Sequence, residues 1–299
     1  MKVVKLNWIE KIGTINNFEK SNLTSYKIGN KLFSFNRAYT MGVLNVTPDS
    51  FSYGGMYNTR RSALKFALKM LDDGADIIDI GGESSRPGSN PVGENEELER
   101  VIPVVKEILN KRPESVLSVD TTKSGVALAA LNAGAVMIND ISALRYDPEM
   151  VNVIKHFDSA VALMHMKGKP KNMQENPYYE NVIEEVYDFL AERSSFAAEN
   201  GIEKIFIDPG IGFGKRLEDN FNLIQRLEDF ISLSYPIMIG FSRKSFIGKL
   251  LDLEVDKRDE ATMALNTLAI SRGAKIIRTH NVKLGVQSCK LMNQNNLKS

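Results

Sequence analysis

The sequence predicts a single (β/α)8 barrel. Eight short runs rich in Ile and Val recur along the chain, longer amphipathic stretches separate them, and no break in composition divides the 299 residues. The short runs are apolar on both faces, as is typical of buried parallel strands. Eight such strands alternating with helices favour a closed barrel over an open sheet, and this chain length is ordinary for one barrel.

The first predicted element is a β-hairpin that precedes the barrel. Apolar and polar residues alternate over 26–35 on both sides of Gly29-Asn30, a two-residue turn signal. We expect this hairpin to plug the N-terminal mouth of the barrel, a face that usually serves stability. Residues 1–25 form an N-terminal extension, and the barrel domain covers residues 26–299.

The strands and helices of the barrel follow in alternation. A helix is clearest over residues 61–73, where apolar side chains share one face and Gly74 follows as a stop. Two further helices, 123–132 and 181–200, also end at a glycine. The eight predicted strands are residues 40–45, 77–81, 116–120, 136–140, 160–164, 204–208, 236–240 and 275–279.

The composition narrows the classes of function. The chain is 43% hydrophobic and 25% charged, with a net charge of +1, which is typical of a soluble globular protein without a nucleic-acid partner. No apolar run approaches the roughly 20 residues that span a bilayer, and the N-terminus lacks the apolar core of a secretory signal. Cys289 is the only cysteine, so an internal disulfide is impossible. We therefore expect a cytoplasmic protein with no membrane partner.

Hydrogen-bonding side chains stand at the C-terminal ends of all eight predicted strands, where such barrels place their active sites. A single aspartate there is most simply a helix cap, but eight polar ends together are harder to explain in that way. Carboxylates and amides suit a polar heterocycle, and cations suit an anion. In chain order the ends hold Asn45, Asp79, Asp120, Asn139, Asp140, His165, Asp208, Ser242, Arg243, Lys244, Arg278 and His280. His165 is as readily explained by a structural role.

Two long loops rich in glycine follow the first two strands. They read VTPDSFSYGG at 46–55 and GGESSRPGSNPVG at 81–93. Loops of this length in a compact barrel are usually functional or disordered. Arg86 offers a bidentate phosphate donor on the second loop, and Arg278 and His280 lie at the other edge of the mouth. A diphosphate held between these cations is the natural interpretation. Neither a Ser-His-Asp order nor an HExxH motif supports a hydrolase.

Eight motifs, one at each strand end, carry a family resemblance. They are MGVLNVTPDSFSYGG (41–55), DIGGESSRPG (79–88), SVDTTKS (118–124), MINDIS (137–142), LMHMKGKPKNMQ (163–174), DPGIGFGK (208–215), GFSRKSFIG (240–248) and RTHNV (278–282). In this order they resemble the signatures of the dihydropteroate synthases, from about residue 38 to the C-terminus.

The resemblance implies an activity. Such an enzyme is a transferase of folate biosynthesis that joins (7,8-dihydropterin-6-yl)methyl diphosphate to p-aminobenzoate and releases diphosphate. The resemblance also implies a homodimer and a Mg²⁺ ion contacted by Asn45. Mg²⁺ often takes one or two protein oxygens and completes its shell with phosphate and water, so the ion should arrive with the diphosphate.

The resemblance further assigns roles to single residues. It implies pterin contacts from Asp120, Asn139, Asp208 and Lys244. It implies that Phe213 and Ser245 form the p-aminobenzoate side. The diphosphate region corresponds to Ser85, Arg86, Arg278 and His280, and Thr279 of the same RTH motif is included among the substrate-binding residues. The catalytic set is Asp120, Lys244, Arg278 and His280, with Asp120 stabilising a pterin cation and the cations stabilising diphosphate.

Three positions depart from the family pattern, and two other functions share the barrel. Tyr53 replaces an acidic residue, Ser85 a threonine and Asn281 an aspartate, and none of these changes removes a residue assigned to chemistry. The alternatives are a methyltetrahydrofolate–corrinoid methyltransferase and a non-catalytic pterin-binding protein. SRKS (242–245) and RTH (278–280) favour the synthase over the methyltransferase, because methyl transfer needs no cations to bind diphosphate. The two intact loops favour the synthase over the non-catalytic protein, which would not need both of them.

Overall fold

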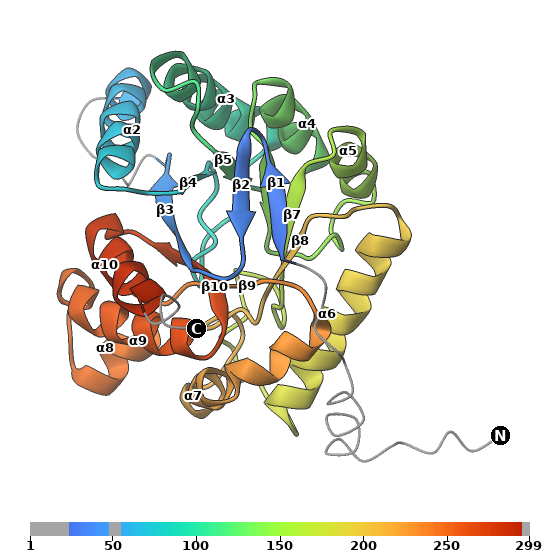
Figure 1. The fold of residues 1–299 in the computed structure, drawn as a ribbon, viewed down its shortest axis with the longest axis vertical. Helices are drawn as coiled ribbons and strands as arrows, with labels where there is room; N and C mark the ends of the chain where they lie inside the picture. The colour runs from blue at the N-terminus through green and yellow to red at the C-terminus, as the bar shows by residue number, and fades with distance from the viewer. Residues whose placement is uncertain (1–23, 48–54, 295–299) are drawn as a thin grey trace.

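Eight parallel strands close into a barrel in the computed structural model, which describes residues 24–47 and 55–294. The strands are β3 (Tyr39–Asn45), β4 (Ile77–Gly81), β5 (Leu117–Asp120), β6 (Met137–Asp140), β7 (Ala160–Met164), β8 (Ile205–Asp208), β9 (Ile237–Ile239) and β10 (Ala274–Thr279). They follow the order β10-β3-β4-β5-β6-β7-β8-β9, with helices around the outside (Figure 1). The predicted (β/α)8 barrel is confirmed.

The helices fill the intervals between the strands. They are α2 (Gly55–Asp72), α3 (Glu94–Lys111), α4 (Ser124–Asn132), α5 (Met150–His156), α6 (Val182–Glu199), α7 (Leu217–Gln225), α8 (Ser245–Leu251), α9 (Asp259–Ser271) and α10 (Val282–Asn293), with short 3-10 turns at η2 (Leu227–Leu233) and η3 (Val255–Lys257). The predicted second and third helices agree with α4 and α6 to within one residue at each end, whereas α2 begins at Gly55 rather than at residue 61. Among the described helices none is long and apolar enough to cross a membrane.

The predicted hairpin is present as β1 (Ser25–Ile28) and β2 (Lys31–Ser34), paired antiparallel around Gly29-Asn30. Its two blue strands lie across the near end of the barrel in Figure 1. Phe33 is fully buried and its ring lies 4.8 Å from that of Tyr39 on the first barrel strand. Tyr26 donates a hydrogen bond to the carbonyl of Ile205 and packs edge-on against Phe206. The hairpin therefore closes the N-terminal mouth of the barrel, as expected.

Strand alternation sorts the barrel side chains into two sets. One set points inward and, near the hairpin, forms a purely apolar cluster. Its members from the barrel strands and from the residue before β5 are Tyr39, Met41, Ile77, Val116, Met137, Ala160, Ala162, Phe206, Met238 and Ile276. The other set points outward to the helices and belongs to the main core. Because the alternation continues along each strand, the inward set also decides which residues meet at the C-terminal mouth.

Candidate active site

Inward-pointing residues at the C-terminal ends of the strands line one pocket. Two residues beyond the apolar layer, Ile77 is followed by Asp79, Met137 by Asn139, Phe206 by Asp208 and Ile276 by Arg278. The pocket is lined by Val43, Ser85, Asp120, Asn139, Ile141, Met164, Asp208, Phe213, Gly240, Ser242, Lys244, Arg278 and His280. Eight of the eleven residues expected to bind substrate thus meet in one place. They are Ser85, Asp120, Asn139, Asp208, Phe213, Lys244, Arg278 and His280.

Arg278 links two carboxylates across this pocket. Its Nε donates to Asp79 Oδ2 at 2.7 Å, and one terminal nitrogen donates to Asp120 Oδ2 at 2.9 Å. Buried charges need such partners, since an unpaired buried charge is costly. The sequence assigned Arg278 to a diphosphate. The structure adds that two of its donors already bind carboxylates, and the remaining terminal nitrogen has no partner among the described residues.

Asp79 is a site residue that the expected set omits. It is fully buried, and its Oδ2 accepts from both Arg278 and the amide nitrogen of Asn139, the latter at 3.0 Å. That bond turns the amide so that Asn139 Oδ1 lacks a partner within the described residues, as does Asp79 Oδ1. The sequence places Asp79 at a strand end without a role, and strand alternation indicates that it points inward, because it shares the face of Ile77.

Burial raises the pKa of Asp120 to about 7, although Arg278 opposes the shift. Asp79, Glu97 and Asp140 add further negative charge nearby and raise it as well. A carboxyl group with a pKa near 7 is only partly ionised at neutral pH. A cationic ligand would favour its ionised form and would be stabilised by the resulting negative charge.

Lys244 faces Asp208 across the other side of the pocket. Burial lowers the pKa of Lys244 to about 8, with Asp208 opposing the shift. Burial raises the pKa of Asp208, with Lys244 opposing it. The ammonium of Lys244 lies 4.7 Å from the centroid of the Phe213 ring and donates to the Ile211 carbonyl. A donor, an acceptor and an aromatic wall therefore lie side by side.

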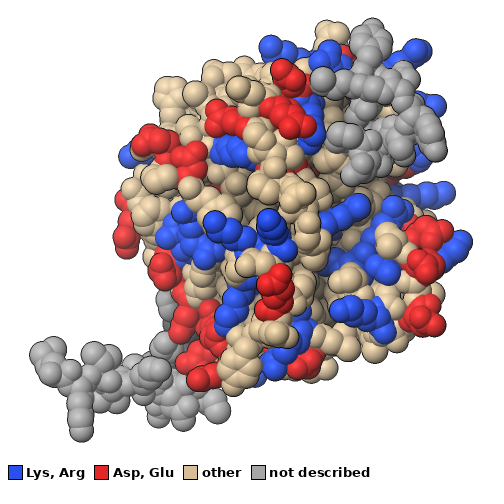
Figure 2. All heavy atoms as spheres, turned by 180° about the vertical axis from the view of Figure 1, so that it is seen from behind, with Lys and Arg blue, Asp and Glu red and all other residues tan. Residues whose placement is uncertain are grey.

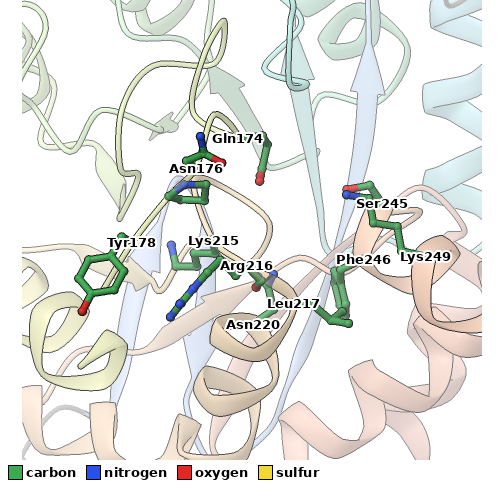
Figure 3. Close-up of a pocket in the computed structure, with 11 residues that line it drawn as sticks. Gln174, Asn176, Tyr178, Lys215, Arg216, Leu217, Asn220, Ser245, Phe246 and Lys249 are labelled. Carbon is green, nitrogen blue, oxygen red and sulfur yellow. Dashed lines mark hydrogen bonds between the residues drawn. The ribbon is translucent and has the colours of Figure 1, made fainter. Parts of the chain in front are cut away.

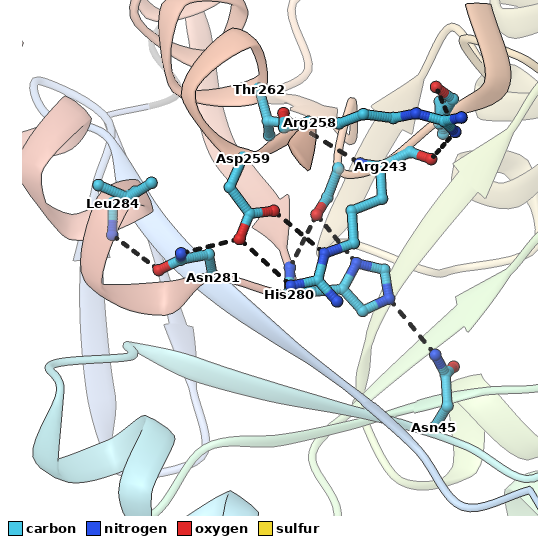
Figure 4. Close-up of polar contacts among 10 residues, drawn as sticks. Asn45, Arg243, Arg258, Asp259, Thr262, His280, Asn281 and Leu284 are labelled. Carbon is cyan, nitrogen blue, oxygen red and sulfur yellow. Dashed lines mark hydrogen bonds and ion pairs between the residues drawn. The ribbon is translucent and has the colours of Figure 1, made fainter. Parts of the chain in front are cut away.

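His280 is held by hydrogen bonds at the edge of the mouth (Figure 4). Its Nδ1 lies 2.9 Å from Ser242 Oγ, and its Nε2 lies 3.4 Å from Asn45 Nδ2. Burial lowers the pKa of His280 to about 3, and the neighbouring Arg278 lowers it further. The ring is therefore neutral near pH 7. In the free protein His280 is therefore a neutral ring and not one of the cations expected at the mouth.

Asn281 has a structural role beside this network. Its side chain caps α10 by accepting from the Leu284 amide at 3.3 Å and donates to Asp259 at 3.0 Å (Figure 4). Asp259 in turn holds Arg243, with the two oxygens 3.0 and 3.2 Å from the guanidinium nitrogens. An amide donates to Asp259 here, which an aspartate at position 281 could not do. The departure at Tyr53 lies outside the described residues.

Three of the expected substrate-binding residues do not line the pocket. Thr279 is fully buried on the outward face of β10, where its methyl group lies against Gly285 of α10. Its side chain therefore points away from the pocket, and its place among the substrate-binding residues stays a prediction. Arg86 is exposed on the second loop, close enough to lower the pKa of His280. Ser245 lines a neighbouring cleft beside Phe246 and opposite Gln174 (Figure 3).

Cations also mark the face of the molecule that carries the mouth. Figure 2 shows the side opposite the hairpin, with Lys and Arg side chains gathered across its middle. The loop after β7 contributes Lys167, Lys169 and Lys171, and the last two line a second cavity that shares Ser85 and Asp120 with the pocket. Such a distribution favours an anionic substrate even though the whole chain is nearly neutral.

Comparison with known proteins agrees with this geometry. Residues 41–280 match the family model described as pterin binding enzyme. The dihydropteroate synthase of Haemophilus influenzae is 44% identical over 255 residues, which is 85% of this chain and 92% of that protein. The chain belongs to the dihydropteroate synthase family. The family match begins within β3 and extends through β10, and it does not include the hairpin.

Solved dihydropteroate synthases share the whole fold. The Yersinia pestis enzyme, determined with a sulfonamide drug complex, superimposes with a TM-score of 0.85 at 40% identity, covering 91% of this chain and 99% of that one. The Xanthomonas albilineans enzyme, in complex with 7,8-dihydropteroate, gives a TM-score of 0.81 at 37% identity, covering 92% and 99%. This dihydropteroate synthase family member therefore has the complete barrel of its relatives.

Proposed function

We propose that the chain condenses (7,8-dihydropterin-6-yl)methyl diphosphate with p-aminobenzoate to give 7,8-dihydropteroate and diphosphate. The observation that carries this proposal is one pocket lined by Asp120, Asn139, Asp208 and Lys244. The first three present acceptor oxygens, which suit the N–H groups of an aminopyrimidinone edge. Lys244 presents a donor, which suits the carbonyl oxygen of the aminopyrimidinone ring. The apolar side chain of Met164 gives a flat ring a surface to lie against.

The bond changes follow from the electron-rich ring. The bond between the methylene carbon and the diphosphate oxygen breaks, and its electron pair leaves with diphosphate. The dihydropterin delocalises the positive charge at its methylene group, and the carboxylate of Asp120 stabilises that charge. The amine nitrogen of p-aminobenzoate then forms the new bond to carbon and loses a proton. No covalent bond to the enzyme is needed.

Diphosphate would lie at the mouth between the second loop and the end of β10. Ser85, Arg86, Arg278 and His280 supply a hydroxyl, two guanidinium groups and a neutral imidazole there. Mutagenesis at such positions commonly costs a factor of 10²–10³ in rate, because the donors act on charge that develops in the transition state.

The residues present fit a Mg²⁺ ion only together with its substrate. Among the described residues no group of three His, Cys, Asp or Glu side chains could hold a metal. Asn45 points its amide nitrogen toward His280, which leaves its oxygen as a ligand of the kind that Mg²⁺ prefers. We propose Asn45 as the one protein ligand, with phosphate oxygens and water supplying the rest. When bound, the ion would neutralise charge on the leaving diphosphate.

The p-aminobenzoate side would begin at Phe213 and Lys244 and continue to Ser245. Lys244 lines the pterin pocket, while Ser245, its neighbour in sequence, lines the adjoining cleft. An aryl amine entering between them would place its ring against Phe213 and its carboxylate near the Ser245 hydroxyl. This arrangement brings the amine nitrogen toward the pterin methylene group.

Incubation with both substrates and Mg²⁺ tests the proposed reaction. A synthase releases diphosphate only when p-aminobenzoate is present, and it forms one dihydropteroate for each diphosphate. Omission of p-aminobenzoate is the control for simple hydrolysis. Pterin binding without diphosphate release would instead identify a non-catalytic protein, and transfer of a methyl group from methyltetrahydrofolate to a corrinoid protein would identify the methyltransferase.

We also propose a cytoplasmic homodimer. Exposed apolar side chains at the end of α8 and in η3, namely Leu250, Leu251 and Val255, offer a surface that a second copy could cover. Analytical ultracentrifugation of the purified chain tests the dimer, and a mass near 33.4 kDa at micromolar concentration would contradict it.

A further inference from the structure

The loop that connects β8 to α7, residues 209–216, is held by side-chain hydrogen bonds from its own Lys215 and from three residues outside it. Each of five consecutive carbonyl oxygens accepts a side-chain hydrogen bond. Gly210 and Phe213 accept from Lys215, Ile211 from Lys244, Gly212 from Gln174, and Gly214 from Tyr179. Loops on a barrel surface usually leave such carbonyls to water. Complete pairing by side chains therefore fixes this loop in one conformation.

Close contact with the loop after β7 explains why glycines occur here. Gly210 and Gly214 have φ values of +68° and +63°. A Cβ atom at Gly210 would lie 1.8 Å from the His165 carbonyl oxygen, and one at Gly214 would lie 2.2 Å from that of Lys167. Only glycine fits these positions without displacing the backbone. The two loops are thus packed backbone against backbone.

Lys215 lies at the centre of this packing. Its side chain is buried, with 3% of the residue exposed. Its ammonium group has three N–H donors and three close acceptors, the Gly210 carbonyl at 2.9 Å, the Phe213 carbonyl at 3.2 Å and His165 Nδ1 at 2.9 Å. Burial lowers the pKa of Lys215, while the carboxylate of Asp208 opposes the shift.

His165 supplies the acceptor that comes from outside the loop. Its ring packs edge-on against Phe189 of α6 at 4.9 Å, which fixes the orientation of the imidazole. Burial lowers the pKa of His165 well below its usual value, and the charge of Lys215 lowers it further. The ring is therefore neutral, and Nδ1 can accept from the ammonium group. None of the roles assigned to the pterin, diphosphate or metal uses either residue.

We propose that Lys215, anchored by His165, is a positioning residue that sets the Phe213 wall of the p-aminobenzoate site. Its ammonium group binds the carbonyl of Phe213 itself and that of Gly210, three residues earlier, so it holds the backbone that carries the Phe213 ring at the pocket wall. Without those bonds the Phe213 ring loses its fixed place 4.7 Å from the Lys244 ammonium group. This inference rests on the proposed placement of p-aminobenzoate against Phe213.

Lys215→Met tests the inference, because it keeps the apolar stem and removes all three donors. We expect KM for p-aminobenzoate to rise about tenfold, a typical loss for hydrogen bonds from a charged group. We expect KM for the pterin diphosphate to change less than about threefold, since Asp208 keeps its own bond to the Gly210 amide. An unchanged p-aminobenzoate KM, or an equal rise in both KM values, would overturn the inference.

Conservative and matched variants separate positioning from general loosening. Lys215→Arg should recover part of the lost affinity, because its guanidinium keeps a positive charge and N–H donors beside the same carbonyls. Tyr179→Phe removes the donor to the Gly214 carbonyl, which lies beyond Phe213, and should leave both KM values within about twofold. If Tyr179→Phe equals Lys215→Met in effect, the assignment to Lys215 is wrong.

Two further variants keep the test decisive. Lys215→Met can fail to fold, so His165→Phe removes only one acceptor and should raise the p-aminobenzoate KM about threefold with the same selectivity. An unchanged KM in the folded His165→Phe protein would count against the anchor. Phe213→Ala tests the underlying site. If it leaves the p-aminobenzoate KM unchanged, both the proposed site and this inference fail; if it raises KM while Lys215→Met does not, only the inference fails.

Discussion

The two ends of the barrel interior use the same strands in opposite ways. At the N-terminal end the inward side chains are apolar, and the hairpin residues Tyr26, Ile28 and Phe33 complete their packing. At the C-terminal end, two residues further along, many of the inward side chains are polar or charged, among them Asn139, Asp208 and Arg278. Some of their atoms, including Asp79 Oδ1 and Asn139 Oδ1, have no partner among the described residues.

This difference separates stability from function. Burying apolar surface is favourable without any ligand, so the plugged end can be complete in the free protein. Burying charged and polar groups is favourable only when they are paired, and the mouth pairs some of them internally through Arg278 while leaving others for a substrate. Substitutions at the plugged end should therefore lower the free energy of unfolding. Substitutions at the mouth should affect substrate binding or turnover.

The largest effect is expected from Phe33→Ala in the hairpin. Removing this fully buried ring leaves a cavity between the hairpin and Tyr39, and such truncations cost about 3–5 kcal/mol. Urea denaturation should show that loss, while the folded protein keeps its affinity for pterin. A loss of pterin affinity with unchanged stability would mean that the hairpin belongs to the active site.

Asp120→Asn, at the opposite end of the barrel, should produce the next largest effect. The substitution keeps the shape but removes the charge that stabilises the pterin cation. We expect kcat to fall about 100-fold with a smaller change in KM, the pattern of an interaction that strengthens in the transition state. A rise in KM alone would make Asp120 a binding residue only. The ion pair between Asp120 and Arg278 is also lost, so denaturation of the variant is the control for folding.

Asp208→Ala should weaken pterin binding by about tenfold or more. The substitution removes an acceptor for the donor edge of the ring and leaves Lys244 without its facing carboxylate. Losing a charged hydrogen-bond partner typically costs about 1.5–3 kcal/mol. Calorimetric titration of pterin into the folded variant measures the loss, and near-unchanged affinity would contradict the proposed orientation of the ring.

The pH dependence of kcat/KM should reveal the same two residues. The pKa of Asp120 is raised to about 7, and its carboxylate is the active form, so activity should rise with pH through this value. The pKa of Lys244 is lowered to about 8, and its ammonium is the active form, so activity should fall above this value. Each unit beyond either limit should reduce kcat/KM about tenfold. An acid limb that persists unchanged in Asp120→Asn would assign it to another group.

The smallest effect is expected from Thr279→Val. The residue stands in the same RTH motif as Arg278 and His280, but its side chain faces α10 rather than the pocket. We expect both KM values to stay within about twofold, because the substitution changes no group that reaches the substrate. Loss of activity in a fully folded variant would show that the outward face of β10 matters for the site.

The sequence alone determined the barrel, the hairpin and the membership of most of the site. Local patterns suffice for these, because strand periodicity, turn residues and polar strand ends are properties of neighbouring residues. The predicted barrel strands agree with the observed ones to within one residue at every end. The motifs also identified Asp120, Asn139, Asp208 and Lys244 as the residues that the barrel brings together.

Only the tertiary structure decided how these side chains are paired and charged. The neutrality of His280, the link of Arg278 to Asp79 and Asp120, and the contact of Lys215 with His165 all join residues that are far apart in the chain. Their pKa values depend on burial and on the sum of nearby charges, neither of which a strand pattern contains. Thr279 shows the same limit, because one step along a strand reverses the face to which a side chain points.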